Sequence, residues 1–186
     1  MDKRNTRLAA LQNRLQQKLQ AKAFFTEKVA PCAELFEAFR SAEVPFQLVA
    51  CIGFQEEWQP HLETEQPAFD IDWKRNEPLE QLLNQLFEEY PSENSLRYVP
   101  PFGKITVGEQ ENPLKKATEL LQLPNQEVLV YWLRYAVVVQ LHLYDLQKLP
   151  EDTVFTFWHG DVVIFPQDLN WLIAYSLEEE WYAGKK

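Results

Sequence analysis

The residues best suited to chemistry by type and spacing are two carboxylates on one face of a predicted strand. Residues 68–73 alternate between apolar and polar, so Asp70 and Asp72 share a face. Along a strand the two carboxylates would stand roughly 6–7 Å apart, a spacing that could hold a divalent cation. With Lys74 the run also fits the acid-x-Lys half of a nuclease core, where the carboxylates hold Mg²⁺ and the lysine orients water.

A simpler interpretation of this pair competes with the metal site. An earlier acid such as Glu56 or Glu57 would complete a nuclease core, but acid-x-Lys arises by chance in a chain with 28 Asp and Glu residues. No basic groove for nucleic acid accompanies the acids. We therefore interpret the face of Asp70 and Asp72 as a solvated acidic surface and expect no tight metal site. A small metal-dependent hydrolase or nuclease using these two acids and Lys74 is the alternative.

Other catalytic and cofactor motifs are absent from the sequence. His61, His142 and His159 are the only histidines, and no two stand four residues apart as in a helical metal site. There is no G-x-S-x-G, G-x-G-x-x-G or G-K-[ST] motif. Cys32 and Cys51 do not make a disulfide framework, and both read as small buried hydrophobic residues in a reducing compartment. We predict no catalytic residues and no cofactor.

The elements that would position any site begin with helices. Residues 3–28 read as one long helix, whose leucines recur at spacings of three, four and four and whose opposite face is Arg, Gln, Asn and Lys. These leucines are Leu8, Leu11, Leu15 and Leu19. We expect the stripe to be buried on its own domain, because exposed it would be an association site. The alternative is an adaptor or homodimer that uses this helix.

Further helices and strands follow. A second helix is predicted near 32–42, a buried strand over 45–54, and a third helix after Asn76 as its cap. A short strand is predicted at Lys104–Val107, and Asn112 followed by Pro113 starts a helix that runs to about Leu123.

From residue 127 the chain becomes β-branched and aromatic. Residues 128–135 and 136–144 are predicted as two strands, with a 17-residue helix as the competing interpretation. Three more strands are expected over Thr153–Trp158, Val162–Phe165 and Trp171–Leu177. The sequence therefore predicts a single α+β domain over residues 1–186, in which N-terminal helices pack on a mainly antiparallel sheet and 127–184 form a C-terminal meander.

Charge is distributed unevenly. Residues 1–28 contain seven basic and two acidic groups, a net charge of +5, whereas the rest contains 11 basic and 26 acidic groups, a net of −15. An acidic body of this kind binds nucleic acid poorly and is steered toward a basic protein. No stretch of 18 apolar residues predicts a membrane span, and the N-terminus lacks the apolar core of a secretory signal, so we expect a cytoplasmic protein.

Glu178, Glu179 and Glu180 stand directly before two aromatic residues, Trp181 and Tyr182. One interpretation is a partner-binding anchor, in which the rings are hot spots and the carboxylates steer a basic protein. The other is a solvated strand exit. The Asp70/Asp72 face is the second candidate partner surface.

The region 127–184 has a distinct order of segments, which begins with an aromatic strand, Tyr131–Tyr135, a second hydrophobic strand, and then Gly160–Phe165. It continues through Asp168–Trp171 to a closing strand and a Glu-rich tail. In this order the region resembles the end of small immunity-type proteins of bacterial toxin–immunity systems. The resemblance implies a non-enzymatic cytosolic inhibitor that covers the active site or substrate path of a toxin. An immunity protein that neutralises a cognate toxin is accordingly our leading functional prediction.

Overall fold

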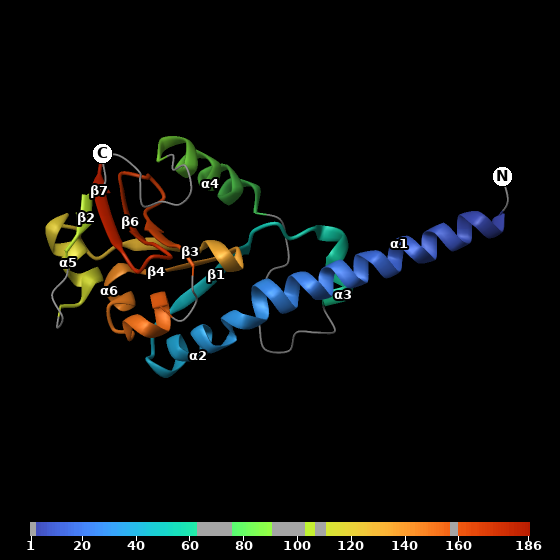
Figure 1. The fold of residues 1–186 in the computed structure, drawn as a ribbon, viewed down its shortest axis with the longest axis horizontal. Coiled ribbons are helices and arrows are strands. Elements are labelled where there is room, and N and C mark those ends of the chain that lie inside the picture. Colours follow the sequence, from blue (N-terminus) through green and yellow to red (C-terminus); the bar gives the residue numbers. More distant parts are fainter. Residues whose placement is uncertain (1–2, 63–75, 91–102, 107–110, 157–159) are drawn as a thin grey trace.

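The computed structural model describes residues 3–62, 76–90, 103–106, 111–156 and 160–186 (Figure 1). Within them the α-helices are α1 (Lys3–Phe24), α2 (Ala33–Ser41), α3 (Gln59–Leu62), α4 (Glu77–Glu89), α5 (Pro113–Leu120) and α6 (Leu143–Leu146). Shorter 3-10 or π-helical segments are η1 (Phe25–Val29), η2 (Ala30–Cys32), η3 (Glu56–Trp58), η5 (Leu133–Tyr135) and η6 (Asp152–Thr156).

Seven strands of the described chain form one antiparallel sheet in the order β1-β4-β3-β5-β6-β7-β2. Their bounds are β1 (Phe46–Cys51), β2 (Gly103–Ile105), β3 (Glu127–Trp132), β4 (Val137–His142), β5 (Val162–Phe165), β6 (Trp171–Tyr175) and β7 (Trp181–Lys185). The sheet and the helices around it confirm the predicted α+β class and the C-terminal meander, since β5, β6 and β7 pair in chain order.

The ambiguous stretch 128–144 is two strands and not a helix. β3 and β4 pair in a register that sets Val130 opposite Val139. The turn between them is η5, and Ala136, at its end, has a positive φ of 52°. β-branched residues stand on both faces of this hairpin, and both faces are covered. A strand pair buried on both faces has apolar residues at consecutive positions, which explains the continuous apolar run.

Alternate residues of the strands enter two different cores. On β3, Val128, Val130 and Trp132 belong to the first core, whereas Leu129 and Tyr131 belong to the second. The period-two alternation of strand side chains therefore divides the apolar content between the two faces of the sheet.

The two cores differ in what covers them. The first face is packed by α2, α5, α6 and η6, together with the end of α1. The second face is covered in the described residues by α4, which buries Leu79, Leu83 and Leu86 against it. Figure 1 shows α4 on one side of the sheet and α2 on the other.

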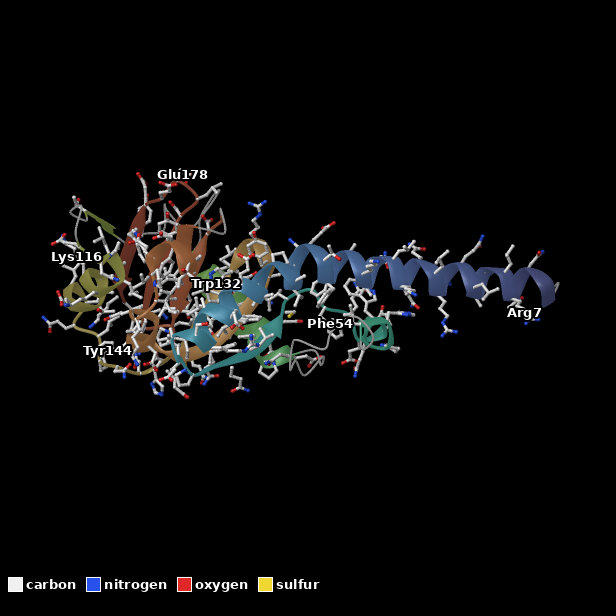
Figure 2. All side chains as sticks on the ribbon, turned by 90° about the horizontal axis from the view of Figure 1, so that it is seen from below. Arg7, Phe54, Lys116, Trp132, Tyr144 and Glu178 are labelled. Carbon is white, nitrogen blue, oxygen red and sulfur yellow. The ribbon has the colours of Figure 1, made fainter. Side chains whose placement is uncertain are left out.

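Helix α1 extends away from the body for most of its length (Figures 1 and 2). Ala21 is its first fully buried residue, and Phe24 and Phe25 pack against the first core. The predicted burial of the leucine stripe is wrong: the four leucines are 56–60% exposed, at Leu8, Leu11, Leu15 and Leu19. The spacing correctly predicted the helix, but the described body does not extend along it far enough to cover the stripe.

The predicted strand over Thr153–Trp158 is also wrong in its described part. Residues 152–156 form the π-helical segment η6, while 157–159 lie outside the described residues. The Val154 carbonyl accepts a hydrogen bond of 2.9 Å from the indole of Trp132, and Val154 and Phe155 are buried. A compact turn places both apolar side chains in the first core, which an extended strand on one face of a sheet would not do.

Candidate functional site

An acidic cleft of about 700 Å³ lies between the chain that follows β1 and the exposed side of α4. Its described lining residues are Ile52, Gly53, Phe54, Gln55, Glu56, Glu57, Glu77, Glu80, Leu83, Asn84, Phe87 and Tyr131. The lining combines carboxylates with apolar and aromatic side chains, and Tyr131 reaches it from β3 of the sheet.

The first wall is shaped by the turn after β1. The Ile52 N–H donates to the Ala136 carbonyl at 2.6 Å, which holds this wall against the β3–β4 hairpin. Gly53 has a φ of +83°, a conformation that glycine adopts without steric cost. The chain therefore turns sharply beyond β1, Phe54 is buried, and Glu56 and Glu57 remain exposed at the cleft.

The second wall is fixed by the cap of α4. The Asn76 side chain accepts a hydrogen bond from the Leu79 N–H at 3.1 Å, so it satisfies a donor in the first turn. Its amide nitrogen also donates to the Val49 carbonyl of β1, at 3.4 Å. One side chain thus joins the start of α4 to the strand that leads into the first wall, and the two walls are held relative to each other.

Carboxylates dominate the electrostatics of the cleft. Glu56 and Glu57 come from the first wall and Glu77 and Glu80 from the first turn of α4, and no Lys, Arg or His is among the described lining residues. Acids in a first helical turn interact favourably with the helix dipole, so Glu77 and Glu80 also stabilise α4 itself. Glu56 and Glu57 belong to the three-residue segment η3 and not to a long helix, so they do not stabilise a helix dipole in this way.

The apolar part of the cleft contains two rings. Phe87 is 38% exposed, and its ring lies edge-on to that of Tyr131 with centroids 6.4 Å apart. Burial raises the pKa of Tyr131, so its phenol stays neutral at physiological pH. Carboxylates beside aromatic rings are suited to hold a cationic side chain with an aliphatic stem, such as Lys or Arg.

Two acids named as completing a nuclease core, Glu56 and Glu57, lie in this cleft. The other members of that alternative, Asp70, Asp72 and Lys74, lie outside the described residues. Among the described residues, no three His, Cys, Asp or Glu side chains gather into a group that could hold a metal ion.

The acidic turn between β6 and β7 divides the predicted C-terminal anchor. Glu178 and Glu179 are exposed, and Glu179 has a φ of +60°. Trp181 and Tyr182 are buried residues of β7 with exposed fractions of 4% and 7%. The structure therefore leaves only the carboxylates accessible.

The rings have structural partners. Trp181 packs edge-on against Phe155 at 4.5 Å between centroids and lies 5.1 Å from the ring of Tyr175. The Tyr182 hydroxyl bonds to the Glu180 carboxylate. A strand residue and an exposed anchor have the same composition, so the sequence left both interpretations open. In the structure Trp181 and Tyr182 are buried on the two faces of the sheet.

The cysteines are both free and buried, as predicted. Burial is the main cause that raises the pKa of Cys32 and of Cys51 to about 12. Both thiols are therefore protonated at neutral pH and poor nucleophiles.

Among the remaining predicted candidates, His142 is exposed and His61 half-buried, and His159 lies outside the described residues. Comparison with protein families, with curated proteins and with solved structures found no match for this chain. Among the helices of the described residues, none has the length and apolar character needed to cross a bilayer.

The sequence reasoning missed the cleft as a unit. Its two walls are 20 or more residues apart in the chain. They meet because β1, which leads into the first wall, is paired with β4, and because α4 packs on the second face of the same sheet. A local signal existed at each wall, namely Gly53 directly after a buried strand and Asn76 as a cap. Neither signal says that the walls face each other.

Proposed function

We propose that this protein is a non-catalytic binding protein that captures a basic segment of a protein partner in the acidic cleft. The observation that carries the proposal is the lining itself, in which the exposed Glu56 and Glu57 and two acids of the first turn of α4 accompany Phe87 and Tyr131. The described lining offers carboxylates, amides and rings, which are groups that can bind a cationic side chain.

The net charge of −15 over residues 29–186 supports the same partner chemistry. Such a field raises the rate at which a basic protein meets the surface by about 10–1,000-fold, and the gain falls with ionic strength. The resemblance of 127–184 to immunity-type proteins suggests the class of partner, a toxin domain whose active site or substrate path would be covered.

The test needs a candidate toxin, taken from a neighbouring gene, and measures its association with this protein. Stopped-flow association is followed from low to high salt for the wild type and for Glu56→Gln/Glu57→Gln. We expect the rate to fall with salt and the variant to associate several-fold more slowly at low salt, because carboxylates at a rim act mainly on association.

Glu178→Gln/Glu179→Gln is the matched control, since it removes the same charge from the other exposed acidic surface. An unchanged rate for this control assigns the interface to the cleft. A rate independent of salt would overturn the steering argument, and a slow control with a normal Glu56/Glu57 variant would move the interface to the β6–β7 turn.

A further inference from the structure

The exposed side of α1 has the form of a helix-pairing seam. At 100° per residue its four leucines fall within about 80° of arc, narrower than the roughly 100° stripe of a helix that faces a domain core. All four are 56–60% exposed, at Leu8, Leu11, Leu15 and Leu19. A stripe of this width fits a complementary surface that is also narrow, such as a single helix or a groove.

The charge of α1 defines what that other surface must carry. The helix contains six basic residues and no acidic one, and of these Arg7, Arg14 and Lys18 are among its exposed side chains. Two such helices side by side would bring like charges together, which opposes association. The complementary surface therefore has to be acidic as well as partly apolar.

This chain carries such a surface in the acidic cleft and α4. In the cleft the exposed Glu56 and Glu57 belong to the same lining as Phe87, which is 38% exposed, and α4 is a helix with acids at both of its ends. The leucines of α1 remain exposed, so α1 does not cover the cleft of its own chain.

The cleft nevertheless lies near the base of α1. Phe54, a lining residue, has its ring 6.4 Å from that of Phe24 at the end of α1, and η3 contacts α1. Figure 2 shows Phe54 at this base and Arg7 toward the far end of the helix. Because 22 residues of helix span about 33 Å, α1 of a second copy is long enough to reach this cleft with its leucines.

From this juxtaposition we infer that the protein forms a two-fold dimer in which α1 of each copy docks on the acidic cleft and α4 of the other. The leucine seam contacts the apolar part of the cleft, and the basic side chains of α1 lie beside its glutamates. The inference uses the same cleft as the proposed function, so a basic partner would compete with the second copy. Self-association is measured without any partner, so a protein that stays monomeric would overturn this inference and would not contradict the proposed binding of a basic partner.

The test is the oligomeric state of the full chain by sedimentation equilibrium over a range of salt. A dimer is expected that weakens as salt rises, because screening reduces attraction between opposite charges. Leu15→Ala should raise the dissociation constant of the dimer about tenfold for each of the two substituted leucines, since the lost methylenes are only partly buried at the contact. Asn13→Ala, on the opposite side of the helix, is the matched control and should leave it unchanged.

A charge exchange identifies the surfaces in contact. Arg7→Glu/Arg14→Glu alone and Glu56→Lys/Glu57→Lys alone should each be monomeric, because each sets like charges against each other. Mixed one to one, they should form a heterodimer, since in a reciprocal exchange both interfaces regain opposite charges. Each variant changes exposed residues, and circular dichroism checks that it is folded.

Three results would overturn the inference. A wild-type monomer at the highest soluble concentration excludes the dimer. A dimer that strengthens with salt and ignores the cleft substitutions indicates pairing of α1 with α1. Failure of the two charge variants to associate, while each is folded, excludes the cleft as the docking surface.

Discussion

Helices α1 and α4 carry the same kind of leucine pattern and have opposite environments. In α4, Leu79, Leu83 and Leu86 are 0–5% exposed against the second face of the sheet. In α1 the four leucines of the seam are 56–60% exposed. The spacing of apolar residues therefore says which side of a helix seeks a partner, and it does not say whether the same domain supplies one.

The two helices also differ in how their ends are held. α4 is tied at its start by Asn76 to β1 and at its end by the Tyr90 hydroxyl, which donates to the Leu169 carbonyl at 2.5 Å. In the part of the chain that the structure describes, α1 buries its first side chain at Ala21, near the end where it joins the body. An anchored helix contributes to the stability of the fold, whereas a projecting helix is available for binding.

The strongest test of this difference exchanges a leucine for alanine in each helix. Leu86→Ala should lower the free energy of unfolding by about 2–5 kcal/mol through lost burial and the cavity left behind. Leu15→Ala should change it by less than about 0.5 kcal/mol, because an exposed side chain loses little on truncation. Urea unfolding at the lowest workable concentration, where copies separate, measures both. Equal losses would contradict the difference between the helices.

A smaller effect is expected at the end of α4. Tyr90→Phe leaves the buried Leu169 carbonyl without the hydroxyl that bonds to it, which should cost about 1–3 kcal/mol. Thermal unfolding checks this loss, and Tyr144→Phe is the control, since that ring is 43% exposed although its hydroxyl also donates to a carbonyl, that of Leu123. A control as damaging as Tyr90→Phe would show that burial of the carbonyl is not the cause.

The smallest effect concerns the ion pair of Glu89 with Lys186, which joins the end of α4 to the end of β7. The hydrogen bond from Lys186 holds the pKa of Glu89 below its usual value. A carboxyl with a lowered pKa in the folded state adds stability above its unfolded pKa and loses it as pH falls through the folded value. Wild type should therefore be slightly more stable than Glu89→Gln near neutral pH, and the two should converge on acidification. A constant difference across the pH range would exclude the ion pair as its origin.

Much of the fold followed from local patterns in the sequence. The caps Asn76 and Asn112 begin α4 and α5 as predicted, because a side chain that accepts from the first turn acts locally. The β3–β4 hairpin followed from β-branched residues on both faces. The conformation of residues 153–156 did not follow from a local pattern, because the Val154 carbonyl accepts from the indole of Trp132, which belongs to β3.

The candidate site was less accessible to sequence reasoning. Glu56 and Glu57 were noted only as supplements to Asp70 and Asp72, because nothing local places them opposite the first turn of α4. The burial of Trp181 was hidden for a similar reason: the ring packs on Phe155 and Tyr175, which the sequence does not bring beside it. Pairing across the sheet, which is a property of the whole chain, decides both cases.

The strand order also has a consequence for the order of synthesis. β1 pairs with β4, and β2 pairs with β7, so each edge of the sheet waits for a strand that the ribosome delivers much later. Until then the nascent chain exposes the apolar residues that will cover the first face, among them Phe36 and Phe39 of α2. Unpaired strands and bare apolar surface favour aggregation during this interval. We therefore expect the nascent chain to be most prone to aggregation before β4 and β7 have been synthesised.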